Sequence, residues 1–188
     1  MLKTLLLAVA VAIVTPNLAE ACLNGTEWTT NDYVRVLVKA EKQVEEGNYG
    51  LAKKTLARVR FPTAAMQERA TDLHAILALR TMKETKALEG ARDHFKARSE
   101  AKPKDLRFKA WIAEADLALG QKDEARAMLV ELKEKDLMPD AYAYLALAKL
   151  STGTERYELY KACRTRAKNK EICELPAEVT SAKAQAAK

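Results

Sequence analysis

The chain has 188 residues, of which 48% are hydrophobic and 31% charged, and its formal net charge is +6 at pH 7. This length suits one domain with a continuous core, so neither a structural metal nor a dense disulfide framework is needed. Alanine, leucine, lysine, glutamate and arginine are abundant and β-branched runs are almost absent after the N-terminus, which favours helix over strand.

Residues 1–21 have the organisation of a secretory signal peptide. Lys3 precedes an apolar run from Leu5 to Val14, and Ala19-Glu20-Ala21 supplies a small-x-small cleavage site. A run of about ten apolar residues is too short for a membrane-spanning helix, which needs ~20, and no later segment approaches that length. We therefore expect an exported protein, periplasmic or extracellular, whose mature part has no membrane span.

Cys22 directly follows the predicted cleavage site, and two interpretations of it stay open. Bacterial lipoproteins carry an acylated cysteine at this position, and lipidation would leave an even number of cysteines. However, Ala19 stands where leucine is usual and Glu20 where a small uncharged residue is usual, which favours ordinary cleavage before a free or disulfide-bonded Cys22. The triplet Asn24-Gly25-Thr26 fits the glycosylation acceptor pattern.

After a lead-in at 22–31, apolar residues at helical spacing predict a helical domain over 32–175. The predicted helices are 32–46, 49–60, 64–84, 86–101, 104–119, 121–135, 139–151 and 154–168. Short breaks that start at 47, 86, 120 and 153 join the helices in pairs, at intervals of 39, 34 and 33 residues. Repetition near 34 residues is typical of an array of helical hairpins.

Residues that start or end helices stand at the predicted boundaries. Pro62, Pro103 and Pro139 each lie where one hairpin should end and the next begin, since proline disrupts a helix interior. Asn31 or Asp32 is predicted to cap the first helix and Thr154 the last. Residues 176–188 contain almost nothing to bury and are predicted to form a disordered tail.

The predicted second hairpin carries Ala91, then Phe95 four residues later and Pro103 eight residues after that, which resembles the second-helix signature of the tetratricopeptide repeat family. Matching positions in the first and third hairpins are Gly47, Tyr49, Ala52, Leu56, Gly120, Ala125 and Leu129. The resemblance implies an all-α fold, a right-handed superhelical array of about four antiparallel helix hairpins. The family's tryptophan, leucine-glycine and tyrosine set is missing from the first helices, and an irregular helical bundle is the alternative.

The resemblance also implies a non-enzymatic interaction or scaffold module of the cell envelope, which binds a peptide or protein partner in a groove. From the repeat register, the expected lining residues are Val36, Ala40, Ala75, Leu79, Lys109, Ala113, Tyr142 and Ala146. A membrane-anchored lipoprotein assembly factor, acylated at Cys22, is one alternative. An enzyme of unrecognised type is another.

No residue pattern predicts catalysis, a cofactor or a metal site. His74 and His94 each lack a second histidine or a cysteine at ligand spacing, and no phosphate-binding loop, nucleophile elbow or zinc motif is present. Cys163 and Cys173 lie ten residues apart around a predicted turn at Asn169, and we expect a structural disulfide between them.

A basic cluster follows in the last predicted helix and just after it: Lys161, Arg164, Arg166, Lys168 and Lys170. One interpretation is a surface for an anionic partner. The other is that cations near a helix C-terminus complement its dipole and keep the end of the array soluble. Nucleic acid is not expected as a partner, because the protein is predicted to be exported.

Overall fold

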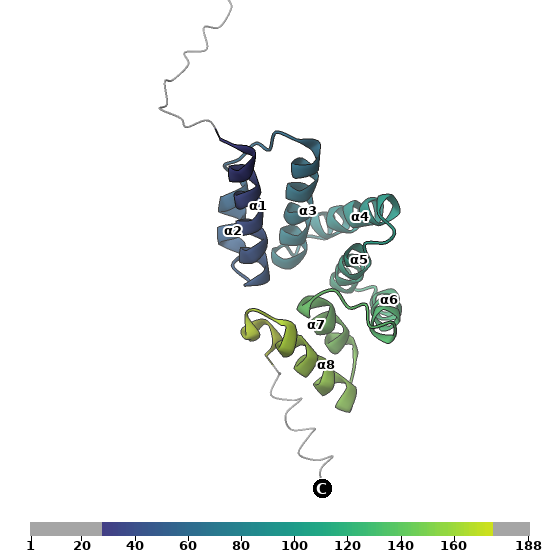
Figure 1. Ribbon diagram of the computed structural model, residues 1–188. Coiled ribbons are helices and arrows are strands. Elements are labelled where there is room, and N and C mark those ends of the chain that lie inside the picture. Colours follow the sequence, from purple (N-terminus) through teal and green to yellow (C-terminus); the bar gives the residue numbers. More distant parts are fainter. Residues whose placement is uncertain (1–27, 175–188) are drawn as a thin grey trace, which may run out of the picture.

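The computed structural model describes residues 28–174, and in this part of the chain all regular secondary structure is helical, with no strand (Figure 1). The predicted signal peptide, Cys22, the triplet at 24–26 and the predicted tail at 176–188 lie outside the described residues. None of the helices in residues 28–174 is long and apolar enough to cross a membrane.

Eight α-helices and one short 3-10 helix make up the described part. They are α1 (Thr30–Glu45), α2 (Tyr49–Leu56), α3 (Ala64–Thr81), α4 (Thr85–Ala101), α5 (Arg107–Ala118), α6 (Lys122–Glu134), α7 (Ala141–Leu150), α8 (Gly153–Arg166) and η1 (Lys170–Cys173). The prediction of eight helices is confirmed, although several end earlier than expected. Helix α4 ends at Ala101 as predicted, and Pro103 contributes to this end because it disfavours helical backbone at Lys102, the C-cap.

The N-terminal caps differ from the prediction. Thr29 is the N-cap of α1, and its backbone N–H donates to the Asp32 carboxylate at 2.9 Å, so Asp32 acts from inside the first turn. The cap of α8 is Thr152. The predictions that Asn31 or Asp32 and Thr154 are caps were therefore wrong, because both helices begin earlier than the apolar pattern indicates.

Glycine marks three of the four breaks between paired helices. Gly47, Gly120 and Gly153 have positive φ angles of 78°, 84° and 58°, a backbone region that L side chains rarely adopt. The second break differs, because it lies at 82–84 and Gly90 belongs to the interior of α4. The predicted break at 86 was therefore a few residues late.

The helices pack in chain order, each against the next, and α1, α3, α5 and α7 also contact one another in succession. Helix α5 lies at the centre of the array (Figure 1). It contributes Phe108 and Trp111 to the core that it shares with α1–α4, and Ala110 and Ala113 to the core that it shares with α6–α8. The two cores are therefore continuous through one helix.

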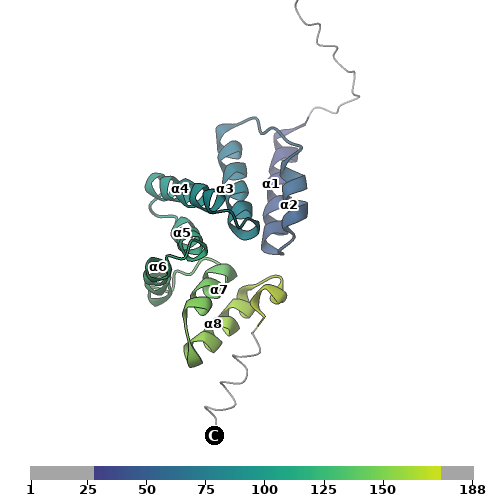
Figure 2. The same cartoon turned by 180° about the vertical axis from the view of Figure 1, so that it is seen from behind.

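The two ends of the array meet, and in both views η1 and the end of α8 lie beside the turn between α1 and α2 (Figures 1 and 2). Lys168 pairs with Glu45, and the Asn169 side-chain amide donates to the Glu46 carbonyl at 3.1 Å. A disulfide between Cys163 and Cys173, whose Cα atoms are 5.8 Å apart, holds η1 against α8. We call residues 167–174 the C-terminal clasp.

Candidate functional site

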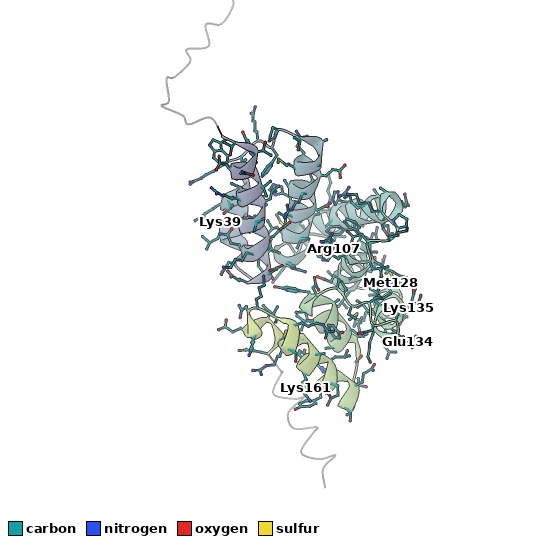
Figure 3. The ribbon with its side chains drawn as sticks, in the orientation of Figure 1. Lys39, Arg107, Met128, Glu134, Lys135 and Lys161 are labelled. Carbon is teal, nitrogen blue, oxygen red and sulfur yellow. A yellow bond between two sulfur atoms is a disulfide. The ribbon has the colours of Figure 1, made fainter. Side chains whose placement is uncertain are left out.

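A cavity of about 550 Å³ opens on the side of the array formed by the odd-numbered helices, and we call it the central cleft. Its walls come from α1, α3 and α5, completed by the end of α4 and by the residues before α7. In Figure 3, Arg107 projects into this hollow and Lys39 lies on the opposite side of α1. The aromatic residues of the lining are Phe108 and Trp111, whose rings pack edge to face at 5.5 Å.

Charged side chains dominate the lining, with five cations and five acids, so the formal charge of the cleft is balanced. The guanidinium of Arg69 binds both carboxylate oxygens of Glu41, which joins α3 to α1. Arg98 donates two hydrogen bonds of 2.9 Å to Asp72, which joins α4 to α3 and raises the pKa of the guanidinium. Because these charges are paired, they fix the walls of the cleft.

Arg80 is the exception among these cations, because its side chain is only 8% exposed and two of its nitrogens make no hydrogen bond within the described residues. Its Nε lies 3.5 Å from Glu114 and its Nη2 lies 3.6 Å from Asp140, neither in hydrogen-bond geometry. The ring of Tyr142 stacks on the guanidinium, with 3.5 Å between the ring centroid and Cζ. Arg80 therefore has N–H groups available for an acceptor.

Trp111 and Glu114 are the other buried groups here with an unused polar atom. The indole N–H of Trp111 and Oε1 of Glu114 have no hydrogen-bond partner among residues 28–174. Burial raises the pKa of Glu114 to about 7, although the nearby Arg80 guanidinium acts in the opposite direction. Near neutral pH the Glu114 carboxyl is thus in equilibrium between its charged and neutral forms.

Arg80 also lines a second cavity of about 510 Å³, the adjoining cavity, which lies between α2, α3, α5 and α7. The hydroxyls of Tyr49 and Tyr142 share a hydrogen bond of 2.6 Å in its wall, and Ile172 of the C-terminal clasp completes it. One buried arginine therefore separates two hollows.

The eight residues expected to line a groove are divided between several environments. Leu79, Tyr142 and Ala146 line the adjoining cavity. Ala40 and Ala113 are fully buried between helices, and Val36 and Ala75 are half-buried at the edge of the first core. The ammonium of Lys109 pairs with Glu131 on α6. None of these five lines the central cleft or the adjoining cavity.

Arg80, which lines both cavities, and Glu114, which lines the adjoining cavity, were absent from the sequence analysis, although the helical pattern contains a signal for them. Arg80 comes four residues after Ile76 and seven after Leu73, which are both buried, so it lies on the apolar face of α3. Glu114 comes three residues after the buried Trp111 on α5. A charge on the buried face of a helix indicates a polar site inside the fold.

The basic cluster is divided in the structure. Arg166 lies over the ring of Tyr144 at 4.5 Å, and Lys168 pairs with Glu45. The remaining three cations, Lys161, Arg164 and Lys170, line a hollow of their own on α8 and η1.

No group of three metal-binding side chains occurs in residues 28–174. His94 lies 2.8 Å from Asp72, beside Arg98, and His74 is exposed on α3. The expected disulfide between Cys163 and Cys173 is confirmed. Comparison of the chain with family models, with curated proteins and with solved structures finds no match.

Proposed function

We propose that this protein is an exported, non-enzymatic binding module that holds a peptide segment of a partner protein in the central cleft. The observation that carries the proposal is the set of buried N–H groups of Arg80 and Trp111, which line the cleft and have no hydrogen-bond partner among the described residues. Buried donors without partners cost free energy, and an acceptor from a ligand removes that cost.

The chemistry of the cleft favours a peptide over a highly charged ligand. Its formal charge is balanced, and Glu114 and Asp140 stand close to Arg80, so a second strong anion would be repelled there. A backbone carbonyl is a neutral acceptor that suits both Arg80 and Trp111. The charge pairs on the walls then meet the polar side chains of the same segment.

Helical-repeat architecture of the tetratricopeptide type is part of the same proposal. Three even-numbered helices each bury an alanine and, four residues later, a large apolar side chain, and the pairs are Ala52 and Leu56, Ala91 and Phe95, and Ala125 and Leu129. A small residue allows two helices to approach closely, and the large one fills the space beside the next pair. The concave side of such an array is the expected place for a peptide.

Export is supported by two independent features. Residues 1–21 have the order of charge, apolar run and cleavage site of a signal peptide. The disulfide between Cys163 and Cys173 suits an oxidising compartment, since thiols are kept reduced in the cytosol.

Site-specific photocrosslinking in the source cell tests where a partner binds. A photoreactive phenylalanine analogue replaces Lys102 or Arg107, which lie at the rim of the cleft, or Lys39 or Lys135, which are exposed elsewhere. We expect the same partner adduct from the two rim positions and none from the two controls. Equal adducts at all four positions, or adducts at the controls alone, would contradict a cleft site.

Tryptophan fluorescence gives a second test with purified protein. The chain has two tryptophans, so the Trp28→Phe variant leaves Trp111, inside the cleft, as the only one. Peptides that cover the crosslinked segment of the partner should change its emission, and Arg69→Gln should weaken that change because it loosens one wall. An unchanged Trp111 spectrum at saturating peptide would place the peptide outside the cleft.

A further inference from the structure

The hollow on α8 differs from the central cleft in its charge. It has a volume of about 550 Å³ and is lined by Tyr157, Lys161, Arg164, Thr165 and Lys170. Three of these five residues are cations and none is an acid, so its formal charge is +3. We call it the α8 hollow.

Its cations are also poorly compensated. The ammonium of Lys161 lies 4.0 Å from the carboxylate of Glu158, and both side chains are well exposed. Arg164 and Lys170 pair with no acid among residues 28–174, whereas Arg69, Arg98 and Arg107 of the central cleft each bind a carboxylate. Two unpaired cations and a third with one distant, exposed acid repel each other, and an anion removes that repulsion.

The hollow is assembled by the fold. Tyr157, Lys161, Arg164 and Thr165 follow one another at helical spacing and share a face of α8. Lys170 comes from η1, which the disulfide between Cys163 and Cys173 holds beside that face. Figure 3 shows Lys161 on the outer side of α8, away from the central cleft.

The dipole of α8 does not account for this arrangement. Cations in the last turn of a helix complement its C-terminal carbonyls, and Arg164 and Arg166 stand there. Lys161 lies more than one turn before the end of α8, and Lys170 belongs to a different element. Two of the three cations therefore require another explanation.

We infer that the α8 hollow binds a phosphate group, carried either by a phospholipid headgroup or by a small soluble phosphate. The cations act through charge, so the hollow discriminates by ligand charge, and a phosphate monoester with nearly two charges is preferred to a carboxylate with one. Arg164 offers a planar pair of N–H groups, and the two lysines add point charges around it. This site is separate from the proposed peptide site in the central cleft.

The test uses the mature chain with its disulfide intact. The cluster variant carries Lys161→Gln, Arg164→Gln and Lys170→Gln, and the matched control carries Lys39→Gln, Lys54→Gln and Arg58→Gln. The control removes three positive charges from exposed positions on α1, on α2 and in the turn after α2, so both variants have the same net charge. Circular dichroism and thermal unfolding of both establish that they are folded.

Two probes separate the two sources of phosphate. Flotation with vesicles of phosphatidic acid and phosphatidylcholine, compared with phosphatidylcholine alone, reports a phosphate monoester in a lipid headgroup. Titration with glycerol phosphate, followed by NMR shifts of residues in α8 and η1, reports a soluble phosphate. We expect the cluster variant to lose at least about tenfold in affinity for one of these probes, and the control to stay within about twofold of the unmodified protein.

Three results would overturn the inference. Equal losses of affinity in the cluster variant and the control would mean that binding depends only on net charge. If the unmodified protein bound neither probe, the hollow would not be a phosphate site. Acetate that shifts the same residues at the same concentration as glycerol phosphate would exclude selection by charge. A further loss in the Cys163→Ala, Cys173→Ala variant, in which Lys170 is released, would support a site assembled by the disulfide.

Discussion

Removal of the disulfide by the double substitution Cys163→Ala and Cys173→Ala should lower the free energy of unfolding by about 2.7 kcal/mol. The two cysteines are separated by 10 residues, and the loop-entropy relation then gives about 9 cal/mol/K for the unfolded chain, or about 2.7 kcal/mol at 25 °C. For a domain of this size, such a change lowers Tm by roughly 5–11 °C. The loss acts through the unfolded state, so it should be similar in the reduced, unmutated protein.

Urea unfolding followed by circular dichroism measures both forms, the double variant and the unmutated protein in excess dithiol. Hydrogen exchange adds a local measurement, because the clasp amides should lose protection when Lys168 and Asn169 are no longer held against the first hairpin. A loss below about 1 kcal/mol in both forms would refute the reasoning, since it would mean that the cross-link does not restrict the unfolded chain as the loop-entropy relation requires.

Three further changes test other parts of the structure. The pKa of Glu114, about 7, lies above its ordinary value of 4.5, so between these pH values the folded state retains a proton that the unfolded state releases. The free energy of unfolding should therefore fall between pH 5 and pH 8, by on the order of 3 kcal/mol at most. Glu114→Gln should remove that part of the pH dependence, and a difference between variant and unmodified protein that stays constant across this range in urea unfolding would contradict the assignment. Phe95→Ala should cost ~3–5 kcal/mol because the side chain is fully buried, whereas Leu51→Ala, at an exposed position, should cost less than ~0.5 kcal/mol; equal midpoints in urea would contradict this. Gly120→Ala should destabilise by ~1–2 kcal/mol because its φ is 84°, whereas Gly90→Ala, inside α4 with open space around it, should stabilise by up to ~1 kcal/mol; calorimetry that gives the same sign for both would be inconsistent with the backbone argument.

Local signals in the sequence were sufficient to predict the helices. Apolar residues that recur at helical spacing, together with the prolines at positions 62, 103 and 139, locate eight helices. Both signals act between residues that are close in the sequence. The disulfide could also be predicted, because its two cysteines are close in sequence. Helix caps were less predictable, because Thr29 extends α1 by contacts that lie outside the apolar pattern.

The site could be predicted only in part, because its contacts join residues that are far apart in the chain. Tyr49 and Tyr142 are 93 positions apart, and Asn169 and Glu46 are 123 apart. No periodicity along the chain reports on such pairs. The repeat register placed Ala40 and Ala113 in a groove, whereas small residues at these positions serve the close packing of neighbouring helices.

The meeting of the first and last helix pairs changes how the protein should unfold. In an open stack, each repeat contacts only its neighbours, so stability is nearly a sum of local terms and terminal repeats can separate first. Here the pairing of Glu45 with Lys168 makes the two terminal hairpins neighbours of each other. Detachment of either hairpin must also break the Glu45–Lys168 pair and the hydrogen bond from Asn169 to Glu46, so we expect unfolding to be more cooperative than in an open stack. Ring closure also adds long-range contacts, which slow folding relative to an open array of equal length.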